Sequence, residues 1–151
     1  MAEVKARERA DVAERGSVLV LMPAAVLVFV VLGAIAVDFA VVFLAEREVS
    51  NAAAAAANDA AGAALDHGRF YADGSLRLDP GAAGTIARAS VGAAGLDHLN
   101  GLDTRVSVSA AEPVVEVTVS ARVGFVFAKA LPGGPEDARV SASATATAEE
   151  R

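Results

Sequence analysis

The sequence has no cysteine and no tryptophan, and it has only two histidines and one tyrosine. The lack of cysteine excludes disulfides, thiolate zinc sites, iron–sulfur clusters and a cysteine nucleophile. Basic residues are also scarce, since 13 Lys and Arg stand against 19 Asp and Glu, a formal net charge of -6. Nucleic-acid binding needs clustered positive charge, so no nucleic-acid partner is expected. We expect no catalytic residues, no metal and no cofactor.

Charge is missing altogether from Ser17 to Val37, and Asp38 is the only ionisable residue between Ser17 and Ala45. As a helix, residues 17–45 would be about 43 Å long, enough to cross a hydrocarbon core of roughly 30 Å. A secretory signal peptide is the alternative, but its apolar core is usually no longer than about 15 residues. The run also passes directly into the charged residues 46–48 without a clear cleavage site. The sequence therefore predicts a retained transmembrane helix over residues 17–45.

The charges beside this run indicate its orientation. Lys5, Arg7, Arg9 and Arg15 precede it, whereas Arg47 is the only basic residue that follows within about 20 residues. The positive-inside rule then places residues 1–16 in the cytoplasm as a leader, and residues 46–151 outside it. We expect a single-pass protein of the cytoplasmic membrane with an extracytoplasmic head.

Two features inside the predicted span suggest contacts. Gly33, Ala36 and Ala40 fall on one helix face, and small residues let a second helix approach closely. The alternative is that Ala and Gly are simply abundant in this chain. A carboxylate in a membrane is costly and usually paired, so Asp38 lies either at the outer interface, the favoured position, or slightly buried.

The helical pattern continues beyond the apolar run. Residues 46–65 contain no proline and include six consecutive alanines at 52–57, which favours one helix from Ser17 to about Leu65. Residues 69–78 then predict a short hairpin around Asp73-Gly74. Asp79-Pro80 is typical of a helix start, and this second helix is expected to run toward Leu99.

The last third of the chain predicts strands. Apolar residues occupy every odd position from Val115 to Phe127, which is the period of a strand with one buried face. Shorter alternating segments lie at 105–110 and 140–147. The predicted fold class is therefore α+β, a long membrane helix continuing into a head with one helix and a three- to four-stranded antiparallel sheet.

Such a layout resembles that of a pilin, and three motifs make the resemblance more specific. They are Glu14-Arg15-Gly16-Ser17 before the apolar run, Val37-Asp38-Phe39 near its end, and 58–64 after it, with Asp59, Ala60 and Ala61. Together with Leu76 to Pro80, they resemble the TadE/TadG-like family of tight-adherence (Flp) pilus assembly proteins. The resemblance covers roughly residues 14–80.

The resemblance implies a non-enzymatic accessory protein or minor pilin, whose partners are the membrane, other pilins or pilus-assembly platform proteins, and a prepilin peptidase. Cleavage by that peptidase would fall after Gly16 and leave Ser17 as the new N-terminus. TadE-type segments carry a glutamate five residues after this point, where this chain has Leu21. The departure favours a TadG-like protein that stays in the membrane.

Two other classes of function remain alternatives. One is a membrane-tethered binding or adhesion module unrelated to pili, and the other is an extracytoplasmic hydrolase. The two Asp-His pairs, Asp66-His67 and Asp97-His98, suggest metal ligands, but their predicted places at helix ends favour capping or turn roles. With two histidines and no nucleophile motif, the hydrolase is the weakest of the three readings.

Overall fold

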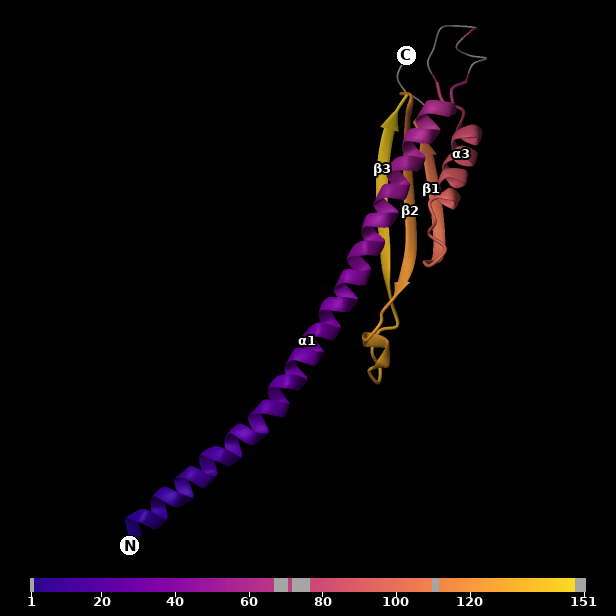
Figure 1. Cartoon of the computed structure of the whole chain (residues 1–151). Helices are drawn as coiled ribbons and strands as arrows, with labels where there is room; N and C mark the ends of the chain where they lie inside the picture. Colours follow the sequence, from indigo (N-terminus) through magenta and orange to yellow (C-terminus); the bar gives the residue numbers. More distant parts are fainter. Residues whose placement is uncertain (1, 67–70, 72–76, 110–111, 149–151) are drawn as a thin grey trace.

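A single long helix carries a small head in the computed structural model of this chain (Figure 1). The structure describes residues 2–66, 71, 77–109 and 112–148, with side chains from residue 21 onward. The long helix is α1 (Ala2–Ala63), and the elements of the head are α3 (Pro80–Ala93), β1 (Asn100–Val108), β2 (Val114–Gly124), the 3-10 turn η1 (Ala128–Ala130) and β3 (Asp137–Thr147).

Helix α1 is longer at its start than the sequence pattern predicts. It begins at Ala2 instead of Ser17 and ends at Ala63, two residues before the expected end. Residues 2–15 are rich in Ala, Glu, Arg and Lys, which are strong helix formers, and they contain neither glycine nor proline. The expected leader is therefore the first part of the same helix.

Two parts of α1 have different surroundings, residues 21–37, which we call the apolar half, and the residues from Asp38 onward. From Leu21 to Val37, every large apolar side chain is exposed, with Met22 and Phe29 each 73% exposed. Beyond Asp38 a stripe of small side chains is buried instead, namely Ala45, Val49, Ala52, Ala53, Ala56, Ala57, Ala60, Ala61 and Ala64. These positions recur every three or four residues, so they form one face of the helix. We call them the alanine stripe.

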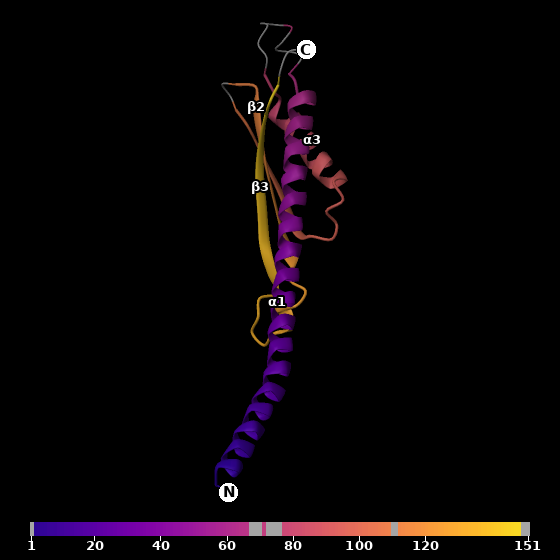
Figure 2. The ribbon, with the colours of Figure 1, turned by 60° about the vertical axis from the view of Figure 1, so that its left-hand side comes forward.

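The alanine stripe packs on an antiparallel sheet. The strand order is β1-β2-β3, and Val117 of the central strand pairs with Val106 on one side and Ala144 on the other. The inner face of β2, residues 115, 117, 119, 121 and 123, is buried as the alternation predicts. Helices α1 and α3 lie side by side on this face (Figures 1 and 2). The opposite face carries mainly Ser, Thr and charged side chains. The fold class α+β is therefore confirmed, with three strands in the part of the chain that the structure describes.

Helix α3 begins as predicted but ends early. The Asp79 carboxylate accepts hydrogen bonds from the backbone N–H groups of Gly81 and Ala82 at 2.7 and 3.0 Å, as an N-cap should. The expectation that the helix runs toward Leu99 is wrong, because it stops at Ala93. Gly95 has a φ of +72°, a left-handed conformation that glycine adopts without strain and that ends a helix.

Strand β2 also stops before its alternating pattern does. The pattern extends to Phe127, but β2 ends at Gly124, and the chain then turns into η1. The predicted hairpin at 69–78 falls mostly outside the described residues, and Leu78 pairs with Leu65 instead. The early end of β2 comes from a contact with Asp38 of α1, which a local pattern does not contain.

Lengthening a residue of the alanine stripe should destabilise the head. Ala56 is fully buried, so Ala56→Leu adds volume where α1 packs and should lower the free energy of unfolding by about 1–3 kcal/mol. The neighbouring Ala55 is exposed, and Ala55→Leu should change it by less than about 0.5 kcal/mol. Denaturant titration of both variants in detergent measures the difference, and equal stabilities would contradict the packing described.

Candidate functional site: the joint between the apolar helix and the head

Asp38 forms the joint between the exposed apolar half of α1 and the head. Its Oδ1 accepts hydrogen bonds from the backbone N–H groups of Val126 and Phe127, at 2.7 and 3.0 Å. Its Oδ2 accepts a third from the N–H of Ala128 at 2.7 Å. The carboxylate is buried by these contacts. It therefore caps η1 from another element, since Phe127, the N-cap residue of η1, makes no side-chain cap of its own.

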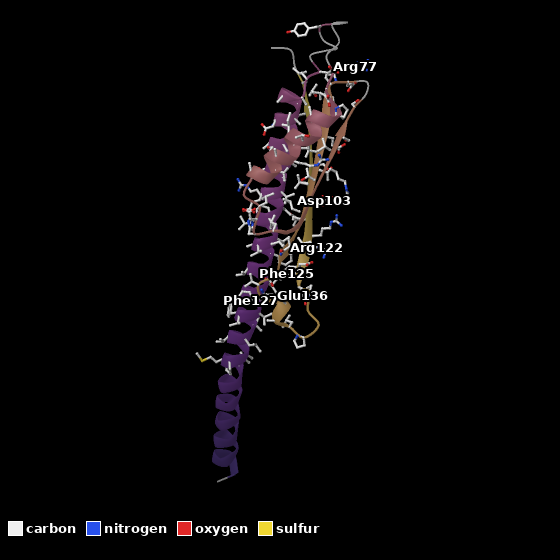
Figure 3. The ribbon with its side chains drawn as sticks, turned by 90° about the vertical axis from the view of Figure 1, so that its right-hand side faces the viewer. Arg77, Asp103, Arg122, Phe125, Phe127 and Glu136 are labelled. Atoms are coloured by element: carbon white, nitrogen blue, oxygen red, sulfur yellow. The ribbon has the colours of Figure 1, made fainter. Side chains whose placement is uncertain are left out.

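The loop that Asp38 holds is tightly wound. Gly133 has a φ of +75°, and a Cβ added to Gly134 would collide with the carbonyl oxygen of Ala128. Phe125 and Glu136, one at each end of the loop, are joined by a hydrogen bond of 3.0 Å from the Phe125 N–H to the Glu136 carbonyl. Figure 3 shows Phe125, Phe127 and Glu136 together at the lower end of the head, below Asp103 and Arg122 on the sheet.

Two further polar contacts hold the head to α1. The Ser90 hydroxyl of α3 donates to Asp59 Oδ2 at 2.6 Å. His98, which precedes β1, lies with its Nε2 2.8 Å from Glu48 Oε2. With Asp38, these contacts attach the head to α1 at three heights along the helix.

The structure brings only some of the residues singled out from the sequence into contact with the head. Of the motif residues, Asp38 and Asp59 bind it directly, and Ala60 and Ala61 belong to the alanine stripe. Gly33, Ala36 and Ala40 are exposed, and none of the described residues of the head covers the helix face that they form. Glu14, Arg15, Gly16 and Ser17 lie in α1, ahead of the described side chains.

Neither Asp-His pair gathers a metal site among the described residues. No group of three His, Asp or Glu side chains there is placed to hold a metal ion. His98 pairs with Glu48 as described, while His67 lies outside the described residues. An open hollow of about 280 Å³ lies beside the start of α3, lined by residues 66, 77–80, 108 and 109.

The apolar half of α1 is long and apolar enough to cross a membrane. The most apolar stretch has a mean hydropathy of 2.9, and 6% of it is buried in the rest of the molecule. A core helix of a soluble protein would be mostly buried, so this stretch lacks the cover that such a helix receives. Among the described residues it is the one helix with these properties.

Comparisons with known proteins add no relative. No protein-family model matches the chain, and neither a curated protein nor a solved structure matches it.

The sequence indicates Asp38 but not its partners. The signal in the sequence was the only acid in a long apolar run, which indicates a costly group that needs a partner. The partner groups are backbone N–H groups about 90 residues further along. Every residue other than proline carries such a group, so the sequence does not indicate which ones bind Asp38.

Replacing Asp38 should loosen the loop and leave the sheet intact. The amide of Asp38→Asn has one acceptor oxygen in place of two, so at least one of the three N–H groups loses its acceptor. We expect hydrogen exchange roughly tenfold faster at residues 126–128, and unchanged exchange within β2. Asp59→Asn is the matched control, because it changes an acid on the same helix that binds a different element. Protected amides at 126–128 in the Asp38 variant would contradict the role given to this carboxylate.

The close turn at Gly134 gives a second test of the loop. Gly134→Ala should disturb the loop, since its Cβ would overlap the Ala128 carbonyl, and should lower the free energy of unfolding by about 1–3 kcal/mol. Gly92→Ala lies in an exposed part of α3 with open space around the new Cβ. It should raise stability by about 0.5–1 kcal/mol, because alanine is the better helix former. Thermal unfolding of both variants checks the opposite signs.

Proposed function

We propose that this chain is a non-enzymatic, single-pass protein of the cytoplasmic membrane that serves tight-adherence pilus assembly as an accessory protein or minor pilin. One observation carries the proposal. A single helix is apolar and exposed from Leu21 to Val37, and a small antiparallel head covers one face of it from Asp38 onward. Pilins combine a membrane helix and a head in this way, and the motifs at 14–17, 37–39 and 58–64 support the same family.

The exposed half of α1 requires an apolar environment. Residues 17–37 span about 32 Å as a helix, close to the roughly 30 Å of a hydrocarbon core. Lipid supplies such an environment for a retained anchor, and the helices of neighbouring subunits supply it in a fibre. The head contacts α1 from Asp38 onward, so we place the outer boundary of the hydrocarbon near Val37, within the 17–45 segment.

The open face at Gly33, Ala36 and Ala40 supports a role in assembly. A second helix packed there would bury small side chains whose backbones allow close approach. The missing glutamate at Leu21 favours the membrane-resident, TadG-like form over a subunit that enters the fibre.

A membrane-tethered adhesion module unrelated to pili is the second candidate. The observation that favours it is the outer face of the sheet, where exposed Ser141, Ser143 and Thr145 on β3 are covered by no residue that the structure describes. Genes for a secretion ATPase, two membrane platform proteins and a prepilin peptidase beside this one would favour the pilus role. Their absence would favour the adhesion module.

Intact mass and N-terminal sequencing of the protein from native membranes test the proposal. A chain that keeps residues 14–16 and resists carbonate extraction is expected for the membrane-resident form. A chain that starts at Ser17 and appears in sheared fibres would identify a processed minor pilin. The Gly16→Leu variant provides the mass of the uncleaved chain. Recovery of a soluble head that lacks residues 17–45 would overturn the proposal, because the apolar run would then be a signal peptide.

A further inference from the structure

The loop between β2 and β3 carries apolar side chains that the head does not cover. Within residues 125–135, which we call the foot, Val126, Phe127 and Leu131 are 45%, 47% and 64% exposed. Outside α1, only Tyr71 and Leu102 among the described residues are large apolar side chains with comparable exposure. Lys129 is the single charged residue of the foot. Exposed apolar groups gathered in this way indicate a contact surface.

The foot lies at the end of the head that faces the apolar half of α1. Figures 1 and 2 show it beyond the ends of the strands, beside α1 and on the side toward the N-terminus. The three hydrogen bonds to Asp38 fix its position along the helix. Since Asp38 is the first charged residue after the uncharged run, the foot begins where that run ends.

Most backbone N–H groups of the foot are hydrogen-bonded within the protein, so the foot can enter an environment with little water. Of its nine residues other than proline, seven donate their N–H to an acceptor within the protein. Three of these N–H groups donate to Asp38. The other four donate to backbone carbonyls at 2.9–3.1 Å, and they belong to Phe125, Ala130, Leu131 and Gly134. Unsatisfied N–H groups are costly in lipid, so a loop can enter a membrane boundary only when most of them are bonded. A loop exposed to water has no such requirement.

We propose that the foot is a second membrane contact, beside the anchor helix. Phe127, Val126 and Leu131 insert at the boundary between headgroups and acyl chains of the outer leaflet, and the Lys129 ammonium binds anionic headgroup phosphates. Apolar and aromatic side chains next to a basic one are the combination that this boundary favours. The inference rests on the proposed membrane anchoring, because α1 in the bilayer brings the foot to this depth.

Lipid is a better occupant than a second copy of the chain because the foot continues the apolar surface of α1. Both surfaces meet at Asp38, and a membrane that covers one reaches the other without a further partner. The foot would also fix the position of the helix in the bilayer. A lone helix is free to slide and rotate in a bilayer, whereas a second contact beside it sets the depth and the rotation.

Tryptophan fluorescence tests the inference, because the natural chain contains no tryptophan. Full-length Phe127→Trp and Leu131→Trp are reconstituted in vesicles of phosphatidylcholine and phosphatidylglycerol, with and without bromine on the acyl chains. Shallow bromines should quench both by roughly half, as expected for side chains buried about 5–10 Å into the boundary. Val30→Trp reports the anchor, and Leu102→Trp is the matched control, an exposed apolar residue of β1 that should keep its fluorescence.

Each outcome decides a different point. Quenching at 30 without quenching at 127 and 131 would overturn the foot and leave the anchor in place. No quenching at any of these positions would overturn the proposed function itself. If Leu131→Cys cross-links to a second copy and Leu131→Trp is not quenched, the foot makes a protein contact and the lipid contact is overturned.

The basic residue gives an independent measurement. Lys129→Glu leaves the apolar side chains in place and reverses the one charge of the foot. In the Leu131→Trp background it should reduce quenching in vesicles with phosphatidylglycerol and change little in pure phosphatidylcholine. If Lys129→Glu leaves the quenching of Leu131→Trp unchanged in the vesicles with phosphatidylglycerol, the headgroup contact of Lys129 is contradicted.

Discussion

The close packing of small side chains along one face of α1 is the constraint on which the rest of the head depends. Alanine at positions such as 53, 56 and 60 lets the helix lie near the sheet, and the valines of β2 fill the space between them. Each alanine buries little area, so the stability of the interface comes from its length. Nine buried positions extend over about 20 residues. The strands accordingly lie along the helix and not across it (Figure 1).

Asp38 marks the point where α1 changes from one environment to the other. From Leu21 to Val37 the helix is apolar all round and the head leaves it bare. After Asp38 the head buries one face of the helix, while Phe39, Phe43 and Leu44 stay exposed. A single carboxylate fixes where the head begins to cover the helix, because it accepts hydrogen bonds from three N–H groups of the loop between β2 and β3. The Asp38 carboxylate, which is costly in an apolar run, is therefore stabilised by the loop that returns to the helix after β2.

Much of the fold could be predicted from the sequence because it follows local patterns. The alternation around Val117 and the cap at Asp79 each depend on neighbours within a few residues, and both are found as expected. The predictions are wrong where a contact with a distant part of the chain determines the local structure. Phe125 and Phe127 continue the strand period, but Asp38 of α1 bonds the chain there and turns it into η1.

The joint could be predicted only in part for the same reason. The position of Asp38 indicated a group that needs a partner, yet the loop that binds it contributes backbone atoms alone. The alternation predicts Phe125 and Phe127 as the end of a strand and not as part of an exposed surface. Their exposure depends on the tight turn at Gly133 and Gly134, which only the folded loop displays.

The continuity of α1 through both environments has a mechanical consequence. No flexible segment separates the head from the apolar half of the helix, so any inclination of that half is passed on to the head. From Asp38 to Ala63 the helix extends about 38 Å, and a tilt of about 20° moves its far end sideways by roughly 13 Å. Bilayer thickness, which governs such tilts, would then set how far apart neighbouring heads stand and which way their sheets face.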